Sequence, residues 1–242
     1  MKDLFGNICS QEQISSFRWK RRKQSQSHYR AHIASFCYPE IANDIEKIGP
    51  YDMPIIRPNY DVPTVVDTTP FDRINAKKSN LESIVIFYIN DNRFATTLSH
   101  PWTYTDKLQQ YSAVIAPDLS QYTDMDYSER LSHNYWNKVF TAYWQNRNVN
   151  IYPNVTWSLP DSYEYSAAGY PRKSVIAINS MGVLKSNFST SIWLDGYRYM
   201  VNVLEPTCIL RYGPKICGER EDISIYLDNK QIDILKYGSK RK

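Results

Sequence analysis

The chain has 242 residues, of which 42% are hydrophobic and 22% are charged, and its formal net charge is +4. These values are typical of a globular protein with one large domain, or one domain and a small extension. No stretch approaches the ~20 apolar residues of a membrane span, and the N-terminus lacks the apolar stretch of a signal peptide. We therefore expect neither a membrane protein nor a secreted one, but a reduced, intracellular protein.

The four cysteines, at positions 9, 37, 208 and 217, show no CxxC spacing and no histidine at a metal-ligand spacing. We expect no metal site, and a buried free thiol at Cys208, which lies in an apolar strand. His133 is predicted on the exposed flank of a helix rather than in a catalytic site. Aromatic residues are frequent, with 20 tyrosines and 6 tryptophans. Rings at this density either build the core or line a stacking surface, and both interpretations stay open.

Residues 1–50 are predicted to form a separate arm, because their polar segment interleaves positive charge with aromatic side chains. The basic run consists of Arg18, Trp19, Lys20, Arg21, Arg22 and Lys23, and residues 236–242 form a basic tail. Basic side chains beside aromatic rings suit contacts with phosphates and stacking on bases, which predicts DNA or RNA as a partner of these termini. An arm that only aids solubility or docks on a partner protein is an equal alternative.

Residues 51–242 are predicted to form a single α/β domain. Four prolines between residues 54 and 70 disfavour helix and indicate an extended, turning segment. Apolar runs of strand length follow at residues 83–89, 114–116, 149–155, 175–178, 208–210 and 223–227. Helical periodicity at residues 103–111, 128–144 and 189–204 separates several of these runs.

The spacing and the character of these runs indicate the fold class. Successive strands start about 25–35 residues apart, as in βαβ crossovers. Their continuous apolar character favours parallel strands that are buried on both faces. We predict an α/β fold with a mainly parallel sheet flanked by helices, together with the basic N-terminal arm. A doubly wound sheet and an incomplete βα barrel both fit this pattern.

Four of the strands run directly into a compact polar turn, at residues 113–122, 151–157, 174–182 and 207–214. In both kinds of fold, ligands bind at the carboxyl ends of parallel strands, so the four turns predict one shared site. The predicted catalytic residues are Asp118, Asn154 and Asn179. The predicted ligand-binding residues are Ser120, Tyr122, Trp157, Ser180, Gly182, Arg211 and Tyr212.

Each assignment has a structural alternative. Asp118 suits a general base, or it caps the following turn. Asn154 and Trp157 suit ligand orientation and stacking, or they form a turn and a lid over the core. Gly182 suits close approach to a phosphate or a tight turn, and Arg211 suits anion binding or a surface salt bridge. The GxGxxG, GxxxxGK[ST] and GxSxG patterns are absent, so no motif specifies a reaction or a cofactor.

The turns APDLSQY (residues 116–122) and YPNVTW (residues 152–157) resemble those of an uncharacterised domain-of-unknown-function family of Gram-positive bacteria, their phages and mobile elements. Its members carry Pro-Asp-aromatic-Ser-x-Tyr and Pro-Asn-Val-x-Trp turns after an Ile/Pro-rich segment, and Leu119 replaces the aromatic residue here. Residues 179–182 and Tyr212-Gly213 are similar to two further turns of the family. The resemblance spans residues 51–213, implies a phage or mobile-element context and an α/β fold, and supplies no activity.

These observations predict a phage or mobile-element protein, in the cytoplasm of the host cell, that binds or acts on nucleic acid or a nucleotide at the carboxyl ends of its strands. The alternative is a non-catalytic interaction protein that targets a host defence or replication factor through a Tyr-rich surface. The cofactor is unknown, and the pattern does not decide whether the protein is an enzyme.

Overall fold

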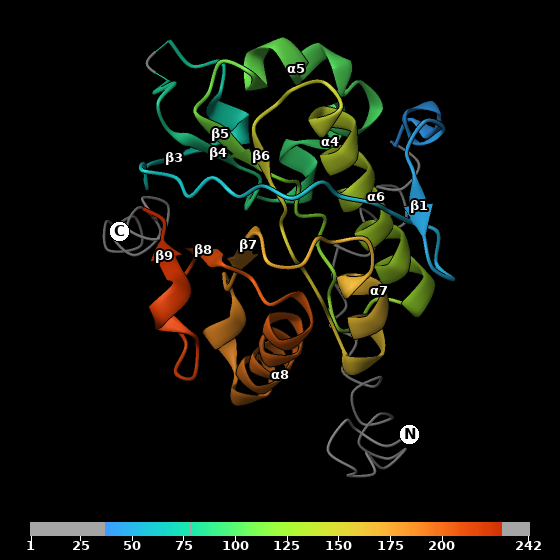
Figure 1. The fold of residues 1–242 in the computed structure, drawn as a ribbon, viewed down its shortest axis with the longest axis vertical. Helices are drawn as coiled ribbons and strands as arrows, with labels where there is room; N and C mark the ends of the chain where they lie inside the picture. Colours follow the sequence, from blue (N-terminus) through green and yellow to red (C-terminus); the bar gives the residue numbers. More distant parts are fainter. Residues whose placement is uncertain (1–36, 78, 229–242) are drawn as a thin grey trace, which may run out of the picture.

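The computed structural model describes residues 37–77 and 79–228, and its centre is a set of parallel strands with helices on the outside (Figure 1). One sheet has the order β3-β4-β5-β6, and a second has the order β7-β8-β9, with every neighbouring pair parallel. The strands are β3 (Thr68–Pro70), β4 (Ile84–Ile86), β5 (Ala113–Ile115), β6 (Ile151–Tyr152), β7 (Val175–Asn179), β8 (Cys208–Tyr212) and β9 (Ser224–Tyr226).

The two sheets are joined at both edges. At the β6–β7 junction (Pro153, Asn154, Val155 and Ala177), Asn154 bridges Ala177 in parallel, and Ala177 N donates to Pro153 O at 2.7 Å. At the opposite edges, Asp228 N donates to Val66 O at 2.8 Å, which brings the end of β9 to the start of β3. The strands therefore follow one another around a circuit instead of lying in an open sheet.

The burial pattern confirms this closure. Alternate side chains of β4, β5, β7 and β8 join Tyr152 of β6 and Leu227 after β9 in an interior cluster. It consists of Ile84, Ile86, Tyr88, Ala113, Ile115, Tyr152, Val175, Ala177, Cys208, Leu210, Tyr212 and Leu227. The intervening residues, such as Val85, Val114 and Ile176, belong to a separate outer cluster with helix residues. A doubly wound sheet has helices on both faces, whereas here one face of the strands packs against the other strands. The predicted α/β fold is confirmed, and its closure is that of an incomplete βα barrel.

The outer layer is built from helices in the strand connections. The α-helices are α4 (Ala95–Ser99), α5 (Trp102–Leu108), α6 (Tyr127–Gln145), α7 (Tyr163–Ala167) and α8 (Asn187–Leu204). The predicted stripe of α6 is buried at Val139, Phe140, Tyr143 and Trp144 because it covers the outer face of the strands. The cap of α8 is Ser186, whose hydroxyl accepts a hydrogen bond from Ser189 N at 3.0 Å. No helix in the described ranges is long and apolar enough to cross a membrane.

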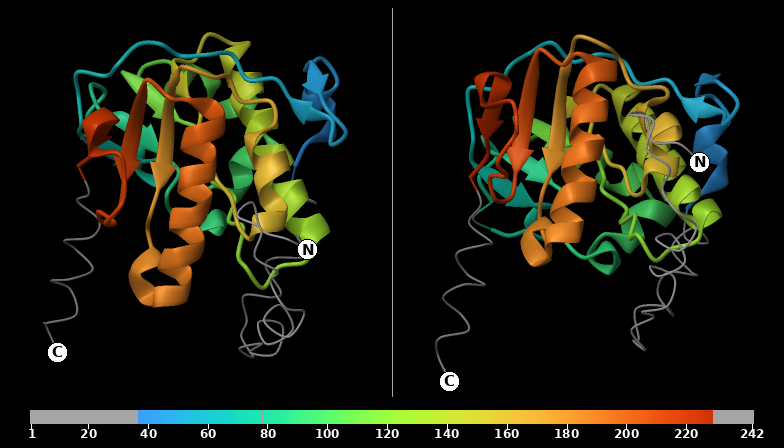
Figure 2. Two further views of the ribbon diagram at one scale, coloured as in Figure 1. Left: turned by 60° about the horizontal axis from the view of Figure 1, so that its bottom comes forward. Right: turned by 90° about the horizontal axis from the view of Figure 1, so that it is seen from below.

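The proline-rich segment closes the amino-terminal end of the barrel (Figure 2). Residues 55–66 run across the starts of β6 and β7, where Val175 N donates to Asn59 O at 2.8 Å. Inside the barrel, the Tyr152 hydroxyl donates to Asp61 O at 2.8 Å. The segment is extended, as its prolines predicted, and it leaves the carboxyl ends of the strands as the end at which a ligand would enter.

The predicted division at residue 50 falls inside a packed unit. The strand β1 (Lys47–Ile48) pairs antiparallel with β2 (Met53–Pro54), and the 3-10 helix η1 (Pro39–Ala42) lies against α6. Cys37, Ala42 and Ile45 are buried in the outer core, because their apolar side chains pack on the side of α6 that faces away from the strands. Residues 37–50 are therefore part of the domain, and the basic run Arg18–Lys23 lies outside the described residues.

Candidate functional site

The carboxyl ends of β5, β6 and β7 bring together the three residues that were predicted to be catalytic. The Asn179 side-chain amide donates to Asp118 Oδ2 at 3.2 Å, and the Asn154 amide also stabilises the Asp118 carboxylate. The strands run in the same direction, so the residues that follow them meet at one end of the barrel. The convergence of Asp118, Asn154 and Asn179 is thus present, and their catalytic roles stay predictions.

The Asp118 carboxyl group has a raised pKa although the residue is partly exposed. Its pKa is raised from 3.8 to about 6, chiefly by desolvation and in part by the nearby charge of Asp91, and this value already includes the lowering by hydrogen bonds from Asn179 and Asn154. The turn-cap alternative is disfavoured, because Leu119 N donates instead to Asn137 Oδ1 at 2.8 Å. A carboxyl group with a pKa of about 6 that accepts hydrogen bonds from side-chain amides is suited to proton transfer.

Asn154 holds the site together and has little capacity left for a ligand. It is fully buried, its Oδ1 accepts a hydrogen bond from the Tyr88 hydroxyl at 2.9 Å, and its Nδ2 donates to Pro117 O at 3.3 Å. The Tyr170 hydroxyl donates to Asn154 O at 2.5 Å. The structure therefore supports a positioning role for Asn154, which fixes the exit of β5 beside the β6–β7 junction.

Asn179 uses its two amide atoms differently. Its Oδ1 accepts from Met181 N at 2.8 Å, which forms the turn after β7, and its Nδ2 faces Asp118. The backbone oxygen of Asn179 accepts from the Trp193 indole at 2.9 Å, so α8 also fixes this strand end. Asn179 thus orients the Asp118 carboxylate together with Asn154.

A second polar group beside Asp118 joins the predicted residue Ser120 to Asp91 and His133, which the sequence analysis did not assign to the site. Ser120 donates its N–H and its hydroxyl to the Asp91 carboxylate at 3.2 and 3.0 Å, and the His133 Nδ1 donates to Ser120 O at 2.6 Å. Burial raises the pKa of Asp91 and lowers that of His133. The expectation that His133 is exposed was wrong, because α6 turns it inward. The signal was the polar Asn90-Asp91 pair after the first apolar run, which also marks a strand end.

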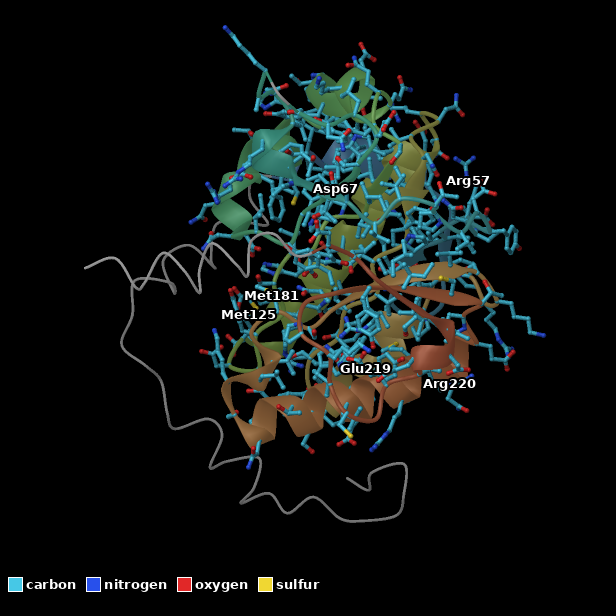
Figure 3. All side chains as sticks on the ribbon, turned by 90° about the vertical axis from the view of Figure 1, so that its left-hand side faces the viewer. Arg57, Asp67, Met125, Met181, Glu219 and Arg220 are labelled. Carbon is cyan, nitrogen blue, oxygen red and sulfur yellow. The ribbon has the colours of Figure 1, made fainter. Side chains whose placement is uncertain are left out.

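Arg211 does not offer a free cation for anion binding. Its side chain is fully buried, its Nη2 lies 2.7 Å from Glu219 Oε1, and its Nη1 donates to Ile178 O at 2.6 Å. The guanidinium also lies 4.9 Å from the Trp193 ring centroid. Figure 3 shows Glu219 beside Arg220 in the connection between β8 and β9, next to α8. The surface salt-bridge alternative is wrong because the ion pair is fully buried beneath α8, and the ligand-binding assignment of Arg211 stays a prediction.

The other predicted ligand residues are divided between the interior and the surface. The Tyr212 ring is buried inside the barrel, stacked 4.9 Å from Tyr88, and the Ser180 hydroxyl donates to Pro214 O at 2.7 Å. Trp157 is half-buried against Trp193 and contacts Gly196 so closely that a Cβ atom there would lie 2.1 Å from its Nε1. These three contacts are structural. Tyr122 is exposed.

Gly182 lies in a tight turn, which was the structural alternative to its predicted role in phosphate binding. Its φ of 79° lies in the left-handed region, and it leads into the 3-10 helix η5 (Val183–Lys185). Phosphate binding by Gly182 stays a prediction. No group of three or more His, Cys, Asp or Glu residues in the described part of the chain could hold a metal ion.

The fold and the cluster define a βα-barrel protein with a candidate site at the carboxyl end of its strands. The chain belongs to the family described as domain of unknown function DUF4417, whose model matches residues 45–230. This match confirms the resemblance that the two turn motifs indicated.

Two curated relatives are phage proteins, each called Gene 1 protein. The one from Mycobacterium phage L5 is 27% identical over 190 residues, which cover 78% of this chain and 83% of the relative. The one from Mycobacterium phage D29 is 26% identical over 163 residues, which cover 67% of this chain and 60% of the relative. No solved structure matches. The chain is therefore a phage-associated protein whose relatives carry no stated activity.

The buried ion pair predicts a large loss of stability on removing one partner. Glu219→Gln should lower the free energy of unfolding by about 3–5 kcal/mol, because it leaves the Arg211 charge buried and uncompensated. Glu221→Gln is the matched control, since Glu221 pairs with Lys215 at an exposed position, and it should change the value by less than about 1 kcal/mol. Urea denaturation measures both. Equal effects would show that Arg211 is not held by Glu219.

The raised pKa of Asp118 predicts that replacing this residue increases the stability of the folded protein by an amount that depends on pH. The folded protein holds the proton of the Asp118 carboxyl group more tightly than the unfolded chain does. The protonated carboxyl group therefore contributes to stability below about pH 3.8, and this contribution is lost as the pH rises to about 6. Relative to the wild type, Asp118→Asn should therefore be more stable at pH 8 than at pH 4 by up to about 3 kcal/mol. Melting curves at both pH values, with Asp61→Asn as control, test this; a loss of stability at pH 8 would instead indicate a turn cap.

Proposed function

We propose that the carboxyl end of the barrel is an acid–base site, centred on Asp118, that binds or acts on a nucleotide or nucleic acid in the cytoplasm of a host cell. One observation carries the proposal: a partly exposed carboxyl group with a pKa of about 6, held between two side-chain amides where parallel strands end. Near that pH both protonation states are populated, so the group can accept and return a proton at little cost.

The surroundings of Asp118 suit a transfer of this kind. Asn154 and Asn179 fix the carboxylate without neutralising it, whereas an arginine or lysine contact would have lowered its pKa. The charge of Asp91 works in the opposite direction and favours the protonated form. The site therefore keeps the pKa of Asp118 at about 6, so that a fraction of the group stays protonated close to neutral pH.

The nucleotide part of the proposal rests on complementary chemistry. The edges of nucleobases present N–H donors of the kind that an Asp carboxylate such as that of Asp118 accepts. Phosphate contacts fall to the basic run Arg18–Lys23, because Arg211 is committed to Glu219 inside the protein. The barrel end would then hold the base or the reacting group, and the basic run would hold the backbone.

The second candidate is a non-catalytic interaction protein that targets a host factor. One observation favours it: Tyr60, Val62, Val66 and Leu81 are exposed apolar side chains, and all four lie at the amino-terminal end of the barrel, opposite the candidate site. Apolar side chains gathered at one end of a molecule are typical of protein interfaces.

The acid–base site predicts a pH-dependent affinity. Binding of the nucleosides, which carry no phosphate that titrates near pH 6, is measured by ligand-observed NMR from pH 5 to pH 8 and should change around pH 6, because Asp118 changes its charge there. Asp118→Asn should remove this pH dependence. Asp61→Asn, which alters an exposed acid at the opposite end of the barrel, should leave it intact. Affinity that is absent for every nucleoside, or that titrates equally in both variants, would contradict the proposal.

The basic run predicts salt-dependent binding of single strands. In filter binding with single-stranded DNA, log affinity should fall with log salt concentration by about 0.7 for each phosphate contact. Replacing Arg18, Lys20, Arg21, Arg22 and Lys23 by Gln should remove most of this slope. The control changes Lys173 and Lys185, two exposed lysines elsewhere on the domain, to Gln. No binding at low salt would remove the nucleic-acid part, and a host protein retained at high salt would favour the second candidate.

A further inference from the structure

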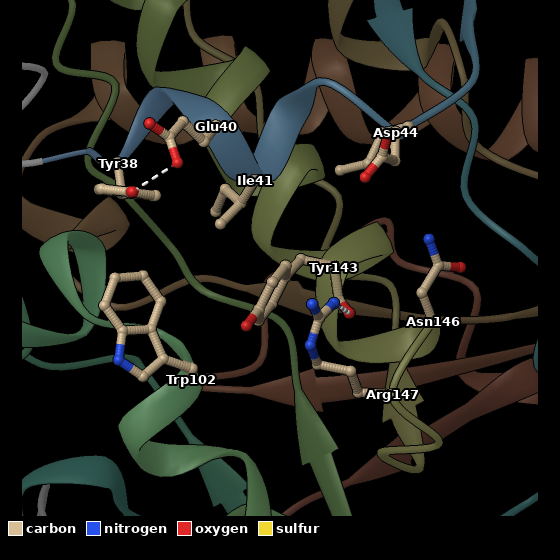
Figure 4. A pocket seen from close by; sticks show the side chains of 9 residues that line it. Tyr38, Glu40, Ile41, Asp44, Trp102, Tyr143, Asn146 and Arg147 are labelled. Carbon is tan, nitrogen blue, oxygen red and sulfur yellow. Dashed lines mark hydrogen bonds between the residues drawn. The ribbon is translucent and has the colours of Figure 1, made fainter.

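A pocket of about 440 Å³ lies on the outside of the barrel, away from Asp118. Its walls come from η1, the start of α5 and the end of α6, three segments that are far apart in the chain. The residues that matter for its chemistry are Tyr38, Glu40, Asp44, Trp102, Tyr143 and Arg147 (Figure 4). None of them was predicted as a site residue from the sequence, where Tyr143 was expected only as part of the apolar stripe of α6.

Aromatic rings form two sides of this pocket. The Trp102 side chain is 45% exposed, and its ring is held edge-to-face by Tyr38 at 5.0 Å and by His100 at 5.4 Å. The Tyr38 hydroxyl donates to Glu40 Oε2 at 2.5 Å, which ties this ring to η1. Figure 4 shows Trp102 and Tyr143 on either side of the hollow, with Tyr38 and Glu40 above it. An exposed tryptophan fixed by its neighbours is a preformed stacking surface.

The pocket already shows which group its rings accept. The Arg147 guanidinium lies 3.6 Å from the centroid of the Tyr143 ring, and its Nη1 donates to Tyr143 O at 3.2 Å. Cations lie favourably over aromatic faces, and tryptophan attracts them more strongly than tyrosine does. Among the described residues, no cation lies over Trp102. The stronger of the two rings is therefore the one still open to a ligand.

The charges around the pocket favour the same class of ligand. Glu40 and Asp44 both contribute exposed carboxylates, whereas Arg147 is the single cation in the lining. A guanidinium placed on Trp102 would thus share the hollow with these two carboxylates. Planar geometry and five donors let arginine stack and pair with a carboxylate at the same time, which a lysine ammonium does less well.

We propose that this pocket binds an arginine side chain of a basic peptide segment, with its guanidinium on Trp102 and its charge matched by Glu40 and Asp44. The proposal is independent of the acid–base site at the carboxyl ends of the strands. The peptide has two possible sources, which the experiment separates: the basic run of this chain at residues 18–23, or a second protein. A single stacked cation contributes modestly, so an isolated arginine should bind in the millimolar range and a tethered or multivalent one more tightly.

The Trp102 indole provides a direct test. The full chain contains 6 tryptophans, so a nitrogen-15-labelled sample gives a small set of indole N–H signals, and Trp102→Phe identifies the one from Trp102. Titration with acetyl-Gly-Arg-Gly-amide should shift that signal saturably. The same peptide with citrulline, which keeps the shape and removes the charge, should shift it far less. Glu40→Gln with Asp44→Asn should weaken binding by about threefold to tenfold.

A matched double variant controls for net charge. Asp61→Asn with Glu82→Gln removes two exposed carboxylates at the amino-terminal end of the barrel and should leave the affinity unchanged. Melting temperatures of both double variants confirm that each is folded. The proposal is overturned if the Trp102 signal does not respond, if citrulline acts as well as arginine, or if the control variant weakens binding equally.

The source of the peptide is separated by repeating the titration on the full chain with Arg18, Lys20, Arg21, Arg22 and Lys23 changed to Gln. If the basic run of this chain is the natural ligand, the added peptide should bind more tightly to this variant than to the wild type, because the internal competitor is gone. If a second protein supplies the arginine, both forms should bind equally. Failure of both forms to bind refutes the site itself.

Discussion

The β6–β7 junction is the constraint on which the barrel and its candidate site depend. β6 and β7 share a single bridge, between Asn154 and Ala177, and two backbone hydrogen bonds beside it. Buried backbone and amide groups need partners, and at Asn154 these are the Tyr88 hydroxyl, Pro117 O and the Tyr170 hydroxyl. The residue that joins the two sheets thereby also sets where β5 ends. Asp118 owes its position to this arrangement.

The same arrangement places the Asp118 carboxyl group where its ionised form reduces the stability of the folded protein. Asp118 is desolvated, lies near Asp91 and contacts amides rather than cations, so its ionised form opposes folding at neutral pH. Structural carboxylates are usually paired with a cation or with several backbone N–H groups, which lower their pKa. A carboxyl group that costs stability at the open end of a barrel fits a functional role better than a structural one. The Asp91–Ser120–His133 group supports the loop that carries it.

Buried charge elsewhere in the protein serves packing. Lys138 on α6 is fully buried and donates to Tyr165 O at 2.9 Å and Ser166 O at 3.2 Å, so it ties α6 to α7. Burial lowers its pKa well below the ordinary value. Arg211 and Glu219 similarly tie β8 to the connection before β9. Polar side chains therefore have three separate tasks here, namely joining the sheets, fixing helices and forming the candidate site.

The sequence by itself determined β4 to β9, their parallel direction and the meeting of Asp118, Asn154 and Asn179, because apolar runs and crossover spacing are local properties that force strand ends to one side. It did not show β3, which lies in the proline-rich segment. Only the tertiary structure decided the closure into a barrel, since an open sheet and a closed one carry the same local pattern. It also decided the burial and the bonding partners of Arg211, Tyr212 and His133, whose surroundings come from distant segments. Burial and pairing depend on which elements pack together, and that information is not present in the spacing along one strand or helix.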